Sequence, residues 1–165
     1  MSTSLFRGLF VASFALSGLL SASVPALAHV APCPYCNLTI TQDTPQLDNE
    51  TVLKFGRKRV EYKCVYCALA EAQSDYQGDL TILAPSEKKG EPIKITRTGT
   101  TWAASAPDAV FAAGKGGHRV CHIIYRAFTN EGAFETWAKA HPEQFDANAK
   151  PLSLAQMVAF AKEDK

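Results

Sequence analysis

The sequence predicts an α+β domain with two strand–strand–helix halves, written ββα(β), and an extra C-terminal helix. Three observations lead to this fold class. Strand-forming stretches flank Gly-rich basic turns in two places, and an amphipathic helical pattern follows each of them. The segments GRKRVEYKCVYCALAEA and GGHRVCHIIYRAFTNEGAFETWA therefore occupy matching positions, a pattern compatible with an internal duplication.

In the first half, residues 51–63 predict a hairpin, because strand-forming residues lie on both sides of Gly56-Arg57-Lys58. Residues 64–76 change to a helical period, which predicts a helix that starts near Cys64. Residues 79–84 form a short apolar run typical of a strand. Residues 29–50 hold the first cysteine pair, and the polar stretch that follows it, residues 41–50, is interpreted as irregular chain.

The second half repeats this order. Residues 93–102 predict a hairpin around residues 98–99, and residues 109–113 and 120–128 predict strands. Apolar residues at helical spacing over 134–141 predict an amphipathic helix that ends before Pro142. The pattern Ser153-x-x-Gln156 is a capping box and predicts the start of the last helix.

The first 28 residues have the pattern of a cleavable secretory signal peptide. Arg7 precedes an apolar run over residues 9–20, and small residues stand at the −3 and −1 positions of a cut after Ala28. That run is too short for a membrane helix, which needs roughly 20 residues. We therefore expect a periplasmic protein with one domain over residues 29–165 and no stable membrane anchor after cleavage.

The charge balance excludes one large class of partners. Without Arg7 the chain has 16 basic and 16 acidic residues. Because a nucleic-acid-binding domain shows a basic excess, we expect no nucleic-acid partner.

All five cysteines follow the predicted signal peptide: Cys33, Cys36, Cys64, Cys67 and Cys121. Disulfides are one interpretation for an exported protein, but an odd number leaves at least one thiol over. Four of the cysteines form two C-x-x-C pairs, the spacing of metal and redox sites. At the predicted strand-to-helix junction, the helix dipole favours the thiolate form, which binds soft metals.

Histidines extend this set of candidate ligands. His122 adds an imidazole next to Cys121, and His118 lies in the Gly-rich turn just before them. His29 would be the first residue after cleavage, where its α-amine and imidazole could chelate copper together. His29 and His118 are additional candidates, since each also fits an exposed position.

The order of these features resembles NosL-like proteins, the copper(I)-binding accessory proteins of nitrous-oxide reductase assembly. The resemblance covers most of residues 33–141, including VEYKCVYCALAEA. It implies a NosL/MerB-like arrangement, a duplicated ββαβ module shared with the organomercurial lyase MerB. The chain departs from the family in lacking a lipid-modified cysteine. Leu38, in Cys36-Asn37-Leu38, stands where the family has a methionine, and the family's second methionine would fall near Cys121 or His122.

From these observations we expect a periplasmic copper(I) metallochaperone or copper buffer that is not an enzyme. It would deliver metal to a copper enzyme or a copper transporter, and a homodimer is compatible with the sequence. The preferred ligands are Cys36, Cys64 and Cys67, followed by Cys33, Cys121 and His122.

Two alternatives stay open. Zinc could be held by both C-x-x-C pairs as a structural Zn(Cys)4 site in an interaction module. The tetrapeptide Cys33-Pro34-Tyr35-Cys36 also matches glutaredoxins and would suggest a thiol-disulfide oxidoreductase, although no buried strand precedes it.

Overall fold

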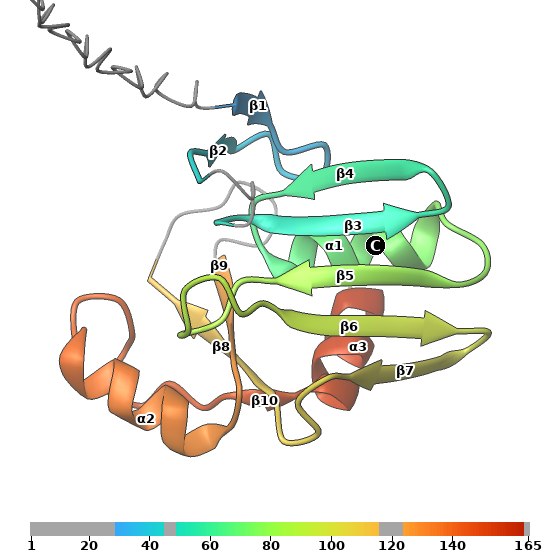
Figure 1. Cartoon of the computed structure of the whole chain (residues 1–165). Coiled ribbons are helices and arrows are strands. Elements are labelled where there is room, and N and C mark those ends of the chain that lie inside the picture. Colours follow the sequence, from blue (N-terminus) through green and yellow to red (C-terminus); the bar gives the residue numbers. More distant parts are fainter. Residues whose placement is uncertain (1–28, 45–48, 116–123, 164–165) are drawn as a thin grey trace, which may run out of the picture.

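A five-stranded antiparallel sheet forms the centre of the computed structural model, which describes residues 29–44, 49–115 and 124–163 (Figure 1). The strands are β3 (Thr51–Phe55), β4 (Lys58–Tyr62), β5 (Leu80–Ala84), β6 (Ile93–Thr98) and β7 (Thr101–Ala104), in the order β4-β3-β5-β6-β7. Leu53 of β3 faces Val60 on one side and Ile82 on the other. Leu53 and Ile82 are fully buried, so this register places their side chains in the core.

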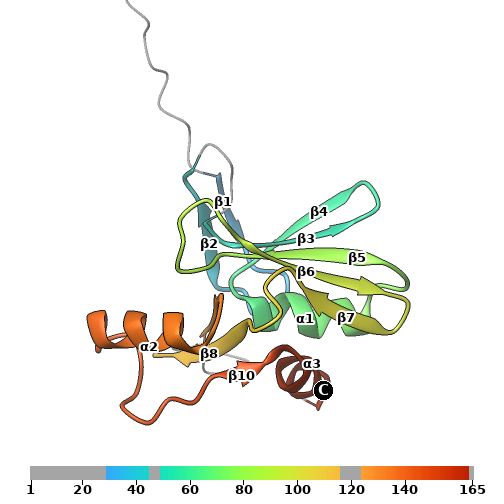
Figure 2. The same ribbon diagram turned by 60° about the horizontal axis from the view of Figure 1, so that its bottom comes forward.

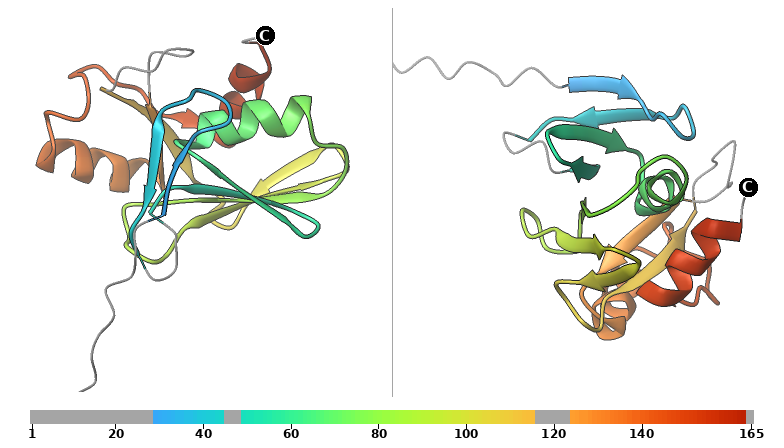
Figure 3. Two further views of the ribbon diagram at one scale, coloured as in Figure 1. Left: turned by 90° about the horizontal axis from the view of Figure 1, so that it is seen from above. Right: turned by 90° about the vertical axis from the view of Figure 1, so that its right-hand side faces the viewer.

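Smaller sheets flank this one. β8 (Val110–Gly114), β9 (Ile124–Phe128) and β10 (Leu152–Ser153) form a sheet in the order β10-β8-β9. β1 (His29–Pro32) and β2 (Thr39–Gln42) form an antiparallel hairpin of their own. In Figures 1 and 3 this hairpin lies on the β4 side of the large sheet.

The three helices are α1 (Val65–Ser74), α2 (Glu131–Ala140) and α3 (Leu154–Glu163). Figure 2 shows α1 and α3 on the same face of the large sheet, while α2 lies beside β8, away from that sheet. α1 packs against β3, β4 and β5 and also against β9 and α3. Seven of its ten residues are therefore buried, including Tyr66, Cys67 and Leu69.

A buried arginine fixes the far end of α1. The Arg97 side chain, on β6, is 8% exposed and donates hydrogen bonds to the carbonyl oxygens of Ala72, Tyr76 and Gly78. These carbonyls lie where α1 ends, so the guanidinium satisfies acceptors that the helix leaves open. It also lies 5.4 Å from the ring centre of Trp102. Arg97 thus ties α1, and the cysteines at its other end, to the sheet.

The mixed α+β class predicted from the sequence is confirmed. The order β3-β4-α1-β5 recurs as β8-β9-α2-β10, and in each set the first strand pairs with the other two strands. The predicted capping box also forms, because Gln156 N donates to Ser153 Oγ at 3.3 Å and Ser153 N donates to Gln156 Oε1 at 2.8 Å.

The interpretation of residues 41–50 as irregular chain is wrong at its start, because Thr41 and Gln42 belong to β2, and the pairing of β1 with β2 was not predicted. Strand β10, which adds two residues to the second sheet, was also not predicted. Of the predicted strand over 120–128, residues 124–128 form β9 and the rest lie outside the described residues. Over the described ranges, no helix combines the length and apolar character needed to cross a bilayer.

Candidate metal centre

The first cysteine pair lies in the loop that joins β1 to β2. Cys33 N donates to the Leu38 carbonyl and Asn37 N donates to the Cys33 carbonyl, both at 2.9 Å, so the chain reverses direction within this loop. Asn37 has a φ of 62°, a left-handed conformation that asparagine tolerates better than most residues. The reversal keeps both side chains inside, with Cys33 at 0% exposure and Cys36 at 2%.

The second pair opens α1. Cys64 is the N-cap residue, with extended backbone angles and no capping hydrogen bond from its side chain. Cys67 lies one turn further on, and its Sγ is 3.6 Å from that of Cys64. Both sulfurs lie near the positive dipole end of the helix, which by itself favours a thiolate. At Cys67 the hydrogen bonds with Cys33 and Cys64 outweigh this effect and raise the pKa.

The fold brings the two pairs together. The Sγ atoms of Cys33, Cys36 and Cys67 all lie within 4.8 Å of one another, and we call these residues the three-sulfur group. All three are buried. Sulfurs at this separation can bind one ion between them, since a metal–thiolate bond is about 2.3 Å long. The three-sulfur group is therefore a candidate metal site.

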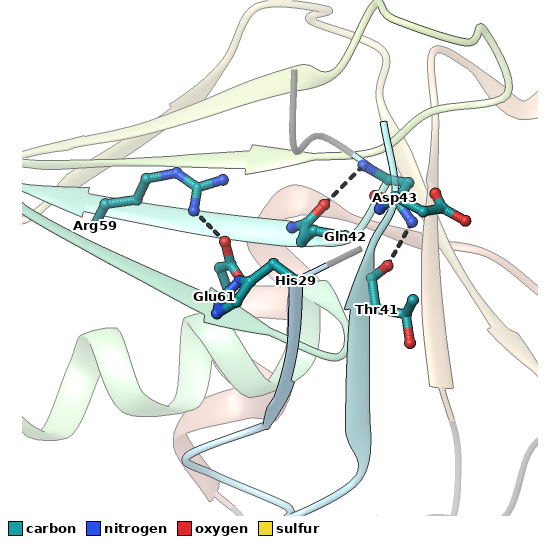
Figure 4. Close-up of polar contacts among 7 residues, drawn as sticks. His29, Thr41, Gln42, Asp43, Arg59 and Glu61 are labelled. Atoms are coloured by element: carbon teal, nitrogen blue, oxygen red, sulfur yellow. Dashed lines mark hydrogen bonds and ion pairs between the residues drawn. The ribbon is translucent and has the colours of Figure 1, made fainter. Parts of the chain in front are cut away.

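Polar contacts hold the hairpin that carries Cys33 and Cys36 (Figure 4). His29 Nδ1 lies 2.9 Å from Oε2 of the buried Glu61 on β4, and Arg59 pairs with the other carboxylate oxygen. Asn49, just before β3, donates two hydrogen bonds to residues of β2. Its Nδ2 donates to the Thr41 carbonyl at 2.6 Å, and its backbone N donates to Gln42 Oε1 at 3.2 Å. The hairpin is thereby fixed against the main sheet, with its cysteine loop next to α1.

The three thiols have very different acidities. A hydrogen bond from the Cys67 thiol is the main reason why the pKa of Cys33 falls to about 5. Backbone N–H groups of Lys63, Cys36 and Tyr35 lower it further, against the opposing effect of burial. Burial, together with the neighbouring Cys33 sulfur, raises the pKa of Cys36 to about 11. The pKa of Cys67 is also raised, chiefly because its proton is engaged with Cys33.

This arrangement is a thiolate that shares protons with two neighbouring thiols. At neutral pH, Cys33 carries the charge, whereas Cys36 and Cys67 keep their protons. A metal that binds all three sulfurs must displace those two protons. The aromatic ring of Tyr35, between the loop cysteines, packs edge-on against Tyr66 of α1 at 5.8 Å. Such apolar surroundings limit the access of water to the sulfurs.

Cys64 lies beside the three-sulfur group and also lines a pocket of about 350 Å³. Glu50 and Lys63 line the same pocket and form an ion pair at 2.6 Å. Its other charged residues are Lys115, which directly follows β8, and Arg126, which lies on β9. The pocket thus connects one thiol of the cysteine cluster to solvent.

Of the ligands predicted from the sequence, the fold brings together Cys33, Cys36 and Cys67, with Cys64 in contact with Cys67. His29 is placed at Glu61 on β4 and is not a member of the three-sulfur group. Cys121, His122 and His118 lie outside the described residues. The four described cysteines are thiols and form no disulfide with one another.

Sequence reasoning gave no sign of the pocket residues Glu50, Lys115 and Arg126. Each comes from a different part of the chain and has no motif around it. Only a prediction that the strand over residues 120–128 packs beside the helix that carries Cys64 could have suggested these pocket residues.

Comparison with known proteins supports the fold. No protein-family model matches the chain, and no curated protein matches it. Among solved structures, the mercury-bound form of MerB2 matches with a TM-score of 0.53 and 18% identity, covering 68% of this chain and 56% of MerB2. The chain thus spans little more than half of MerB2. At this identity the likeness shows a MerB-like α+β fold, and the finer resemblance to NosL-like proteins stays a prediction.

The same likeness corrects one expectation. The sequence led us to expect that the protein is not an enzyme, but its fold is similar to that of MerB2, whose namesake MerB is an organomercurial lyase. The fold therefore gives no support to a non-catalytic assignment, and that expectation is withdrawn. The sequence alone gave no reason to expect catalysis, because residues that are distant along the chain cannot be recognised as neighbours.

Proposed function

We propose that the protein binds one soft metal ion, copper(I), in the three-sulfur group. One observation carries the proposal: three buried cysteine sulfurs from two distant segments lie within 4.8 Å of one another. Thiolates select soft ions such as copper(I) over harder divalent ions. A group with one ionised thiol and two exchangeable protons is suited to hold such an ion and to release it on reprotonation.

The number of sulfurs favours copper(I) over a structural zinc ion. A structural zinc site is closed and almost always has four protein ligands. Cys64, the candidate fourth ligand, is not among the residues whose sulfurs all lie within 4.8 Å. It contacts Cys67 and faces the pocket instead. Three sulfurs suffice for copper(I) but leave a zinc site incomplete.

The biological role we propose is a periplasmic metallochaperone or copper buffer. The signal-peptide pattern supports export, and an exported protein with buried thiolates could keep copper(I) from reacting in an oxidising compartment. The recipient would be a copper enzyme or a copper transporter. The resemblance to NosL-like proteins supports this role.

Competition with a chromogenic copper(I) chelator under anaerobic conditions tests the proposal. The purified protein should bind one copper(I) per chain, and the variant Cys33→Ser/Cys67→Ser should lose it. Cys64→Ser is the matched control, since it also removes a buried thiol at the start of α1 but should keep near-normal affinity. Tight zinc whose removal unfolds the chain would instead indicate a structural site.

A further inference from the structure

The pocket beside Cys64 has a charge character that metal binding alone does not explain. Its lining includes three basic side chains, Lys63, Lys115 and Arg126, and one acidic side chain, Glu50. Lys63 is already neutralised by Glu50 at 2.6 Å. Glu50 also attracts the guanidinium of Arg126, but three basic groups against one acidic group leave the lining with a net positive charge.

Neither of these two cations forms a short ion pair in the contacts that hold its side chain. The guanidinium of Arg126 lies 5.0 Å from the ring centre of Trp137, so its position is set by an aromatic face. Lys115 Nζ lies 3.7 Å from a carboxylate oxygen of Asp146, which is itself highly exposed and therefore strongly screened. Lys115 Nζ also donates a long hydrogen bond of 3.5 Å to the Pro142 carbonyl. These contacts are long, so both cations can still attract an anionic group.

The thiol in this pocket connects it to the metal site. Cys64 lines the pocket, and its Sγ is 3.6 Å from that of Cys67, a member of the three-sulfur group. A metal ion bound by Cys64 is therefore one ligand exchange away from Cys67. At about 350 Å³ the pocket is within the range that accepts a small molecule.

We infer that this pocket receives a soft metal ion carried by a small anionic thiol, with Cys64 as the residue that takes the metal from it. The inference rests on the proposed function and names the donor for that same site. The carrier's carboxylate would face Lys115 and Arg126, while its sulfur would bring the metal to Cys64. A carrier with a neutral or cationic tail lacks the first of these interactions.

The transfer is a ligand exchange without oxidation. The bond between the metal and the carrier sulfur breaks, and a bond between the metal and Cys64 Sγ forms. The Cys64 proton passes to the departing sulfur, which leaves as a thiol. A second exchange then moves the metal to Cys67 and on to Cys33 and Cys36. The proton displaced from Cys67 returns to Cys64, and the proton displaced from Cys36 passes to solvent.

The test compares metal uptake from three copper(I) complexes that differ only in the tail of the thiol: 3-mercaptopropionate, 2-mercaptoethanol and 2-mercaptoethylamine. Metal bound to the protein is quantified after rapid anaerobic desalting at successive times. We expect uptake from the anionic carrier to be roughly tenfold faster than from the cationic one, as for electrostatically steered encounters. The difference should shrink as ionic strength rises.

Variants connect this preference to the pocket. Lys115→Gln/Arg126→Gln should abolish the tail preference, and Lys115→Gln alone, at an exposed position, should reduce it without affecting the fold. Arg57→Gln/Lys58→Gln is the matched control, because it removes two positive charges from an exposed turn that does not line the pocket. It should keep the preference. Cys64→Ser should slow uptake from all three carriers while leaving the chelator affinity near normal.

The outcomes separate this inference from the proposed function. Equal uptake from the three carriers, by a protein that binds copper(I) tightly in the chelator assay, would overturn the pocket's role and leave the metal site standing. A preference that survives Lys115→Gln/Arg126→Gln would overturn it too. A protein that binds no copper(I) from the chelator would overturn the proposed function, and this inference with it.

Discussion

Replacing Cys36 by serine removes one sulfur from the three-sulfur group with little change in shape. Cys36 is the best single position for this test, because it is 2% exposed and lies outside α1, so the helix is left intact. In the metal-free protein it keeps its proton, since burial raises its pKa to about 11. The substitution therefore removes a neutral thiol from the metal-free state but a metal ligand from the loaded state.

The expected loss follows from the number of ligands. Structural metal sites with four protein ligands bind with roughly 10–16 kcal/mol, or roughly 2.5–4 kcal/mol for each ligand. Losing one sulfur of three should then weaken copper(I) binding by about 60- to 700-fold, since 1.4 kcal/mol corresponds to a factor of ten. The proton balance should change as well. Wild-type protein should release the protons of Cys36 and Cys67 on loading at pH 7, whereas Cys36→Ser should release only that of Cys67.

Two assays measure these quantities. Competition with a copper(I) chelator gives the affinity, and calorimetry of the same reaction in buffers of different ionisation enthalpy gives the number of protons released. Circular dichroism checks that Cys36→Ser keeps the secondary structure. Wild-type affinity and wild-type proton release in a folded Cys36→Ser variant would refute the assignment of Cys36 as a ligand.

Three further predictions concern acidity and stability. Because the folded-state pKa of Cys33, about 5, lies below its ordinary value of 9, the stabilising effect of its thiolate is complete above pH 9 and is lost as pH falls through 5. In urea unfolding, the free energy of unfolding of the metal-free wild type should therefore rise relative to that of Cys33→Ser as the pH increases from 5 to 8. A difference that stays constant over this range would contradict the prediction. Arg97→Met should cost roughly 2–4 kcal/mol of unfolding free energy by leaving buried carbonyls at the end of α1 without donors, and a loss below about 0.5 kcal/mol would disprove that function of Arg97. Ser153→Ala should cost about 1 kcal/mol through loss of the α3 cap, whereas an unchanged urea midpoint would show that the cap does not contribute.

Local signals explain why much of the fold could be predicted from the sequence. The turn at Gly56, which has a φ of 56°, separates two strand-forming runs that pair as β3 and β4. The Ser153–Gln156 capping box marks the start of α3 through contacts within one turn. In both cases the residues that determine the structure are close neighbours along the chain.

The β1–β2 hairpin could not be predicted in the same way. Its strands have four residues each, and the loop between them depends on the left-handed Asn37. It is also fixed by Glu61 and Asn49, which lie outside the hairpin. The β-forming character of residues 37–41 is a local signal for β2, but nothing near it in the sequence indicates its partner strand.

The cysteine site was partly predictable for a related reason. Two C-x-x-C pairs predict a shared site, but spacing alone cannot say which sulfur of each pair points inward. The strand-to-helix junction places Cys64 at the N-cap and Cys67 a turn further on, so one lines the pocket and the other faces the hairpin loop. That choice depends on how α1 packs between the sheet and β9, which the sequence does not encode locally.

X-ray absorption spectroscopy of the copper(I)-loaded protein tests the metal site most directly, because it counts and identifies the atoms bound to the metal. We predict three sulfur neighbours and no nitrogen or oxygen neighbour, with the same spectrum for Cys64→Ser. A shell that contains nitrogen or oxygen, or a sulfur count that falls when Cys64 is replaced, would contradict a site made by Cys33, Cys36 and Cys67.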